Sequence, residues 1–202
     1  MFKSFFLIFA MTSIAYGSEA VLKLPLSVYS KIPFSSQFME DGALIRNINY
    51  DAVKRLVPQI EKLRGIKLTT RGESHITVIS PPEAKGWFHP SRKGVDSLIS
   101  WKELHRKYFN TLQSTKFTVK CIGESMEGDK HVFFLIVTSP ELRAIRADIQ
   151  DELESRAKFS GMKTHFDAGA YEPHITIGYI GGDVFSNPKT KCVEDIVLNI
   201  SK

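Results

Sequence analysis

The clearest chemical signal in this 202-residue chain is a short unit that occurs twice. Residues 73–77 read Glu-Ser-His-Ile-Thr and residues 172–176 read Glu-Pro-His-Ile-Thr. Each copy continues with a β-branched residue, Val78 in the first and Ile177 in the second. A unit repeated in the two halves of a chain indicates an internally duplicated fold.

The alternation of the unit predicts which of its side chains act together. Residues i and i+2 of a strand share a face and lie about 7 Å apart, so His75 points with Thr77, and His174 with Thr176. We expect the two strands to face each other across a cleft. A neutral imidazole serves as general base and a protonated one as general acid. The hydroxyls donate hydrogen bonds to phosphoryl oxygens. This chemistry requires no metal and no other cofactor.

The residues next to the motifs have predicted positions as well. Glu73 and Glu172 share the parity of their histidines and could orient the imidazoles, although carboxylates at strand ends are more often solvated. Gly178 has the parity of the cleft and would leave room for a ligand. Tyr179 has the opposite parity and is assigned to the core.

Several functional readings compete at this point. A single His-Ile-Thr on an apolar strand is usually a core histidine, but the matched pair argues against that reading. The first function class is an enzyme with His75 and His174 as its catalytic pair. The second is a binding module that holds nucleotides or RNA ends without turnover. The third is a metal-dependent hydrolase, against which the lack of a His-x-x-x-His motif counts.

The elements that must position these residues alternate along the chain, which predicts an α+β fold. Strands are expected over residues 43–49, 73–80, 116–123, 131–138, 172–180 and 192–200. Asn49 caps a helix that Pro58 should kink or split. A capping box at Ser100 and a cap followed by proline at Ser139 begin two further helices.

With these motifs the chain resembles the 2H phosphoesterase superfamily. Residues 173–178 are similar to the second motif of that family, and residues 71–83 resemble its fungal Swiss Army Knife, RNA-repair-like branch. The resemblance implies a bilobal, pseudo-symmetric α+β fold, with two antiparallel sheets flanking a central cleft and helices outside. It also implies metal-independent hydrolysis of cyclic phosphodiesters, such as 2′,3′-cyclic nucleotides or RNA-end cyclic phosphates. The catalytic histidines of the family map onto His75 and His174, and its phosphate-binding threonines onto Thr77 and Thr176.

The first 17 residues have the pattern of a signal peptide. Lys3 precedes an apolar run over residues 5–15, and small residues follow up to Gly17. We therefore expect a protein that is secreted or stays in the secretory pathway, whose mature chain, residues 18–202, forms a single bilobal domain. After cleavage we expect no membrane association, and we expect a monomer.

Composition and cysteine content limit the partners and the class of protein. The chain is 43% hydrophobic and 24% charged, which excludes a disordered or collagen-like protein. A net charge of +5 favours anionic partners such as phosphate esters or RNA. Cys121 and Cys192 either form a disulfide in an oxidising compartment or remain two buried thiols. Cys121 has the parity of Phe117 and Val119, which places its side chain toward the core.

Overall fold

The computed structural model describes residues 19–33, 43–84, 98–161, 164–184 and 188–202. Its main element is a five-stranded antiparallel sheet with the strand order β2-β3-β6-β5-β4. The strands of this sheet are β2 (Leu44–Ile48), β3 (Ser74–Ile79), β4 (Thr118–Glu127), β5 (Lys130–Thr138) and β6 (His174–Ile180). The predicted signal peptide lies outside the described residues.

A second, smaller sheet differs from the expectation. It consists of β1 (Ala20–Pro25) and β7 (Ile196–Ser201), which pair in parallel. The α+β class is confirmed, but the expectation of two antiparallel sheets is wrong. The second sheet joins segments from the two ends of the described chain, and these segments run in the same direction where they pair. Both motif strands, β3 and β6, belong to the same larger sheet.

The predicted splitting of the first long helix is confirmed. α1 (Tyr50–Lys54) and α2 (Leu56–Arg64) meet at Arg55. Pro58 lies in the first turn of α2, where a missing N–H loses no intrahelical bond. The side chain of Asn49 caps α1 by accepting a hydrogen bond from the Asp51 N–H at 3.1 Å.

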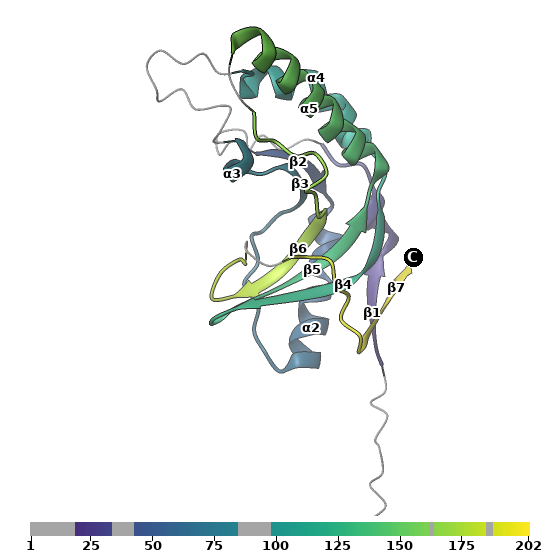
Figure 1. Cartoon of the computed structure of the whole chain (residues 1–202). Helices are drawn as coiled ribbons and strands as arrows, with labels where there is room; N and C mark the ends of the chain where they lie inside the picture. Colours follow the sequence, from purple (N-terminus) through teal and green to yellow (C-terminus); the bar gives the residue numbers. More distant parts are fainter. Residues whose placement is uncertain (1–18, 34–42, 85–97, 162–163, 185–187) are drawn as a thin grey trace, which may run out of the picture.

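The other two long helices begin as the sequence indicates. α4 (Trp101–Ser114) starts with a capping box between Ser100 and Glu103. α5 (Pro140–Ser160) follows a Ser139 cap. Figure 1 shows α4 and α5 side by side at one end of the molecule and α2 at the other, with the strands between them. Two single turns complete the set, η1 (Leu26–Tyr29) and α3 (Pro81–Ala84). Among the described helices, none is long and apolar enough to cross a membrane.

One large apolar core lies on one face of the five-stranded sheet. The inward residues of the two motif strands are Ile76, Val78, Ile175 and Ile177, and all four are buried. They pack in one cluster with apolar side chains of α1, α2, α4 and α5. The opposite face therefore carries the alternate residues of β3 and β6, which include the histidines and threonines.

A buried arginine ties the helical side of the core to the motif strands. Arg146 of α5 donates hydrogen bonds to the Val78 carbonyl at 2.6 Å and to the Asp167 carbonyl at 2.8 Å. Its guanidinium also pairs with Glu83 at 2.9 Å. Because Val78 lies in β3, Glu83 follows that strand and Asp167 precedes β6, Arg146 links the end of the first motif strand to the segment that leads into the second.

Candidate active site

The two motifs meet because β3 and β6 are neighbouring antiparallel strands. Ile76 lies opposite Ile175 in this pair. Continuing the register by one residue on each side places His75 opposite Thr176, and Thr77 opposite His174. Opposed residues of such a pair have Cβ atoms about 5 Å apart, and diagonal neighbours are about 7–8 Å apart. The two imidazoles are therefore diagonal neighbours, with one hydroxyl beside each of them.

This arrangement corrects the expected relation between the motif strands. They were expected to face each other across a cleft, but they lie side by side within one sheet. The strand period still places the four side chains together on one face. His75, Thr77, His174 and Thr176 are all partly buried, while the residues that alternate with them are buried in the core.

An apolar cluster occupies the same face of the sheet next to the motifs. Val132 and Phe134 of β5 are buried there with Val184. The Phe134 ring meets the His174 ring edge-on, with 5.7 Å between their centroids. These apolar side chains lower the polarity around His174, and they limit the rotation of its ring.

The His75 imidazole is held by the carboxylate of its own motif. Its Nδ1 lies 2.8 Å from Glu73 Oε2, and the His75 side chain is 11% exposed. A carboxylate accepts, so this contact places a proton on Nδ1. Proton delivery from His75 to a substrate would then use Nε2. Of the two roles considered for Glu73, the orienting one agrees with this contact.

The His174 imidazole has different partners. Its Nδ1 lies 2.8 Å from the Glu172 carbonyl oxygen, which can only accept a hydrogen bond. Its Nε2 lies 3.0 Å from the Nζ of Lys189, whose ammonium can only donate. Together these two contacts select the neutral tautomer with the proton on Nδ1. Glu172 thus orients His174 through its backbone and not through its carboxylate.

The environment of His174 favours its neutral form. Burial, followed by the charge of Lys189, lowers the pKa of His174 from 6.5 to about 4. The nearby charge of His75 lowers it further, whereas the Glu172 carbonyl and the Asp183 carboxylate oppose the decrease. The two histidines therefore sit in unequal surroundings although their sequence motifs are nearly the same.

A small ionic network surrounds the Lys189 ammonium. Lys189 is 7% exposed, and its Nζ lies 3.8 Å from Asp183 Oδ1. Asp183 is also paired with Arg71. The Glu172 carboxylate accepts a hydrogen bond from the Lys189 backbone N–H at 2.7 Å. Burial is the main cause that lowers the pKa of Lys189, and the positive charge of Arg71 lowers it as well.

A disulfide anchors the segment that carries Lys189. Cys121 and Cys192 are bonded, with Cα atoms 5.7 Å apart. Gly123 of β4 forms a β-bridge with Cys192, and a Cβ on Gly123 would lie 3.0 Å from the Lys191 carbonyl oxygen and clash with the Phe134 ring. The glycine thus permits the segment after Lys189 to cross β4 closely.

Two irregularities in the strands correct predictions of side-chain direction. β4 shifts register between Val119 and Cys121, so Cys121 lies opposite Ile136, which in turn lies opposite His174. The prediction that Cys121 faces the core is therefore wrong. A register shift near Ile177 changes the parity of β6 in the same way, and Tyr179 packs with the apolar cluster beside the motifs.

Gly178 has a different role from the one expected. A Cβ at this position would lie 3.0 Å from the Thr69 carbonyl oxygen and 3.1 Å from Leu68 Cβ. The space beside Gly178 is occupied by the chain itself. Thr69 and Tyr179 exchange two backbone hydrogen bonds of 2.9 Å there. The prediction that Gly178 leaves room for a ligand is wrong.

Sequence reasoning missed Lys189 and Asp183. Neither belongs to the repeated unit, and both lie in the irregular connection between β6 and β7. The signal in the sequence is the group of three charged residues, Asp183, Lys189 and Lys191, between the second motif and Cys192. Arg71, which lies shortly before the first motif, pairs with Asp183.

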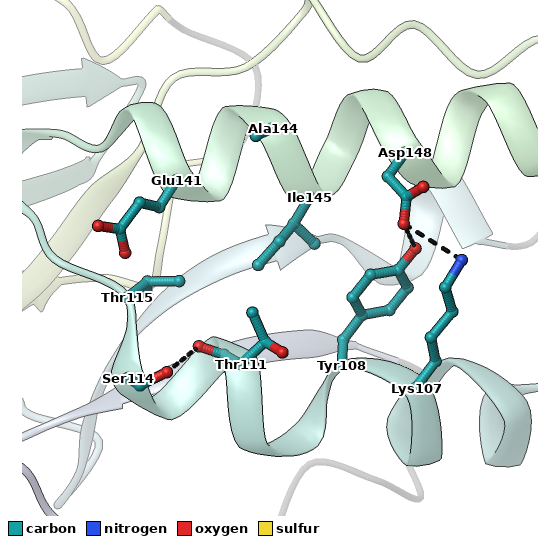
Figure 2. Close-up of a pocket in the computed structure, with 9 residues that line it drawn as sticks. All are labelled: Lys107, Tyr108, Thr111, Ser114, Thr115, Glu141, Ala144, Ile145 and Asp148. Atoms are coloured by element: carbon teal, nitrogen blue, oxygen red, sulfur yellow. Dashed lines mark hydrogen bonds and ion pairs between the residues drawn. The ribbon is translucent and has the colours of Figure 1, made fainter.

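A hollow of about 570 Å³ lies elsewhere, between α4 and α5. Figure 2 shows Lys107 and Tyr108 pointing toward Asp148 across it. The Tyr108 hydroxyl donates to Asp148, and Lys107 pairs with the same carboxylate at 3.2 Å. These charged groups satisfy each other and join the two helices. The hollow contains none of the predicted site residues.

Comparison with known families places the chain. The pattern of the Swiss Army Knife, 2H phosphoesterase domain matches residues 46–185, which include both motifs. The chain belongs to the 2H phosphoesterase superfamily. No curated protein and no solved structure matches it significantly. Membership in this superfamily supports a hydrolase that acts on phosphoester bonds.

Proposed function

We propose that this 2H phosphoesterase is a metal-independent phosphodiesterase that hydrolyses cyclic phosphodiesters, with 2′,3′-cyclic nucleotides or RNA-end cyclic phosphates as substrates. The observation that carries the proposal is the unequal pair of imidazoles on one sheet face, with a threonine beside each. The bilobal, pseudo-symmetric arrangement belongs to the same proposal. Antiparallel pairing about Ile76 and Ile175 is the relation that a local twofold axis would produce.

The proposed reaction moves two protons. Water attacks the phosphorus while Nε2 of neutral His174 takes the proton of that water. The bond from phosphorus to the leaving oxygen breaks, and His75 gives that oxygen its proton. The products are a phosphomonoester and a free hydroxyl. Thr77 and Thr176 donate hydrogen bonds to the non-bridging oxygens, whose charge increases in the transition state.

The different partners of the histidines support this direction of proton transfer. Glu73 accepts from the Nδ1–H of His75, which leaves Nε2 of His75 to deliver a proton to the leaving oxygen. The Glu172 carbonyl and the Lys189 ammonium favour neutral His174, which suits the base. His174 therefore begins the reaction in the neutral form that a general base requires, and the acid role is assigned to the other imidazole of the pair.

A non-catalytic module that binds nucleotides or RNA ends in the same site is the alternative. The contact of Lys189 with His174 Nε2 favours it, since this nitrogen is engaged in the ligand-free protein. The two functions differ in turnover. The mature protein should be incubated with 2′,3′-cyclic nucleotides and linear dinucleotides in excess chelator. We expect release of phosphomonoester from the cyclic substrates. Binding without any product would establish the alternative, and activity lost to chelator and restored by zinc would contradict both.

We further propose that the chain is secreted as a monomer with its N-terminus near Ser18. The Cys121–Cys192 disulfide supports an oxidising destination. N-terminal sequencing of protein recovered from the medium should begin near Ser18. Recovery of the chain only from the cytosol, with Met1 intact, would contradict this.

A further inference from the structure

Lys189 is the buried cation of the site, and it lies beyond the residues 46–185 that the family pattern matches. Its Nζ is 3.0 Å from the Nε2 of His174, the nitrogen that a general base must use. The ammonium also lies over the Phe134 ring, 5.8 Å from its centroid. The apolar ring and the disulfide-anchored segment hold this side chain at the motif face and away from solvent.

The charges that face His174 come from three residues on two parts of the chain. Lys189 lies on the connection to β7, Asp183 on the same connection near β6, and His75 on β3. Arg71 and Lys189 share the carboxylate of Asp183. The Glu172 carboxylate accepts a hydrogen bond from the backbone N–H of Lys189. An incoming phosphate would thus meet the buried ammonium of Lys189, whose neighbouring carboxylate, Asp183, also pairs with Arg71.

We propose that Lys189 is a further catalytic residue of this site, one that exchanges a hydrogen bond to His174 Nε2 for one to a substrate phosphate oxygen. In the free protein the ammonium keeps Nε2 an acceptor. When a phosphodiester binds between the four motif side chains, its negative charge attracts the ammonium, and Nε2 becomes available to the attacking water. No bond to Lys189 forms or breaks, and Lys189 keeps its protons throughout.

This inference rests on the proposed function and assigns the roles within it. The cation next to His174 prevents that ring from starting as the acid. Proton transfer then runs in one direction, from water to His174 and from His75 to the leaving oxygen. The binding of phosphate by Lys189 adds a charge-assisted hydrogen bond to those of Thr77 and Thr176.

The test compares Lys189→Met, Lys189→Arg and the control Lys191→Met, a substitution at an exposed lysine of the same segment. The pKa of His174 is measured from the NMR titration of its ring in the ligand-free full chain, with native amide spectra as the folding check. We expect Lys189→Met to raise it by about one pH unit, since a like charge is removed. Lys189→Arg should restore much of the difference, and Lys191→Met should leave the titration unchanged.

Two further measurements separate this inference from the proposed function. Inorganic phosphate should bind at least about tenfold more weakly to Lys189→Met than to the native chain. Turnover of a 2′,3′-cyclic nucleotide should decrease by at least the same factor, with rescue by Lys189→Arg. If the native chain shows no turnover, the proposed function fails, while the titration and phosphate binding still decide the role of Lys189. An unchanged titration and unchanged phosphate affinity in Lys189→Met would overturn the inference. If Lys189→Met does not fold, Lys189→Gln takes its place, and an unchanged titration of His174 together with unchanged phosphate affinity in folded Lys189→Gln would overturn the inference as well.

Discussion

Ile76 and Ile175 lie opposite each other on neighbouring antiparallel strands, and this single pairing fixes the geometry of the site. Because directly opposed residues share a sheet face, the flanking His75 and His174 emerge on the other face at a diagonal. Each imidazole then has a threonine from the opposite motif beside it. A phosphate placed between the four side chains would be reached by both histidines without movement of either strand.

Replacing either catalytic histidine should reduce turnover strongly. His75→Ala and His174→Ala should each lower kcat at least about a hundredfold, because each removes a general-catalysis step. The double variant should be little worse than the more damaging single one, since the two groups act as a unit. His165→Ala, at an exposed histidine, is the matched control. Full activity in either single variant would contradict the assignment.

The threonines should contribute less than the histidines. Thr77→Val or Thr176→Val keeps a β-branched strand residue and removes only the hydroxyl. Losing a hydrogen bond to a charged oxygen costs about 1.5–3 kcal/mol, which corresponds to roughly ten- to 150-fold in kcat/KM. Steady-state kinetics with a cyclic nucleotide measures this. Losses equal to those of the histidine variants would show that the hydroxyls take part in proton transfer.

The low pKa of His174 should make stability depend on pH. The folded chain holds this pKa at about 4, below its ordinary 6.5, so the unfolded chain binds more protons between these values. The contribution of His174 to the free energy of unfolding is therefore fully present above about pH 6.5. It decreases as the pH falls toward 4, by on the order of 1.4 kcal/mol per pH unit. Urea unfolding at several pH values measures it. His174→Gln should show a shallower decrease than the native chain, and equal slopes would disprove the linkage.

The disulfide should support both stability and activity. Its sequence separation of 71 residues corresponds to about 4 kcal/mol of stabilisation in the chain-entropy view. Replacing both Cys121 and Cys192 by serine should lower the free energy of urea unfolding by that order. It should also reduce turnover at temperatures where the variant remains folded, because Lys189 lies on the anchored segment. Two reactive thiols in the unreduced, denatured native chain would contradict the bridge.

Gly178 should tolerate no side chain. A Cβ would press on the Thr69 carbonyl and on Leu68 at about 3 Å, both behind the second motif. Gly178→Ala should lower stability by about 1–3 kcal/mol through overpacking. Gly169→Ala, in the exposed loop before β6, is a comparison at which we expect a smaller loss. A Gly178→Ala chain as stable as the native one would show that this contact is loose.

Local sequence patterns were sufficient to predict most elements near the site. The alternation around His75 and His174 correctly predicts strands with an apolar inner face, because the period of two is a property of the extended backbone. Caps at Asn49, Ser100 and Ser139 begin their helices as predicted, since each cap bonds to residues only a few positions away.

Local patterns predict the direction of a side chain less well where a strand is irregular. One extra residue in β4 and one near Ile177 in β6 reverse the parity that simple alternation assigns to Cys121 and Tyr179. A bulge depends on which residues the neighbouring strand supplies, and that pairing is not encoded in the strand itself. The parallel pairing of β1 with β7 is a contact of the same long-range kind.

The repeated His-Ile-Thr unit by itself identified the four motif side chains and the family that carries them. Only the tertiary structure made the two copies unequal, because Glu73 reaches His75 within one motif whereas Lys189 reaches His174 from a separate segment. The position of that ammonium depends on a disulfide, on Gly123 and on the Phe134 ring, which come together only when the chain folds. Charge and burial around a side chain are set by such distant contacts, so the motif determines which groups are present and the fold determines the proton that each one holds.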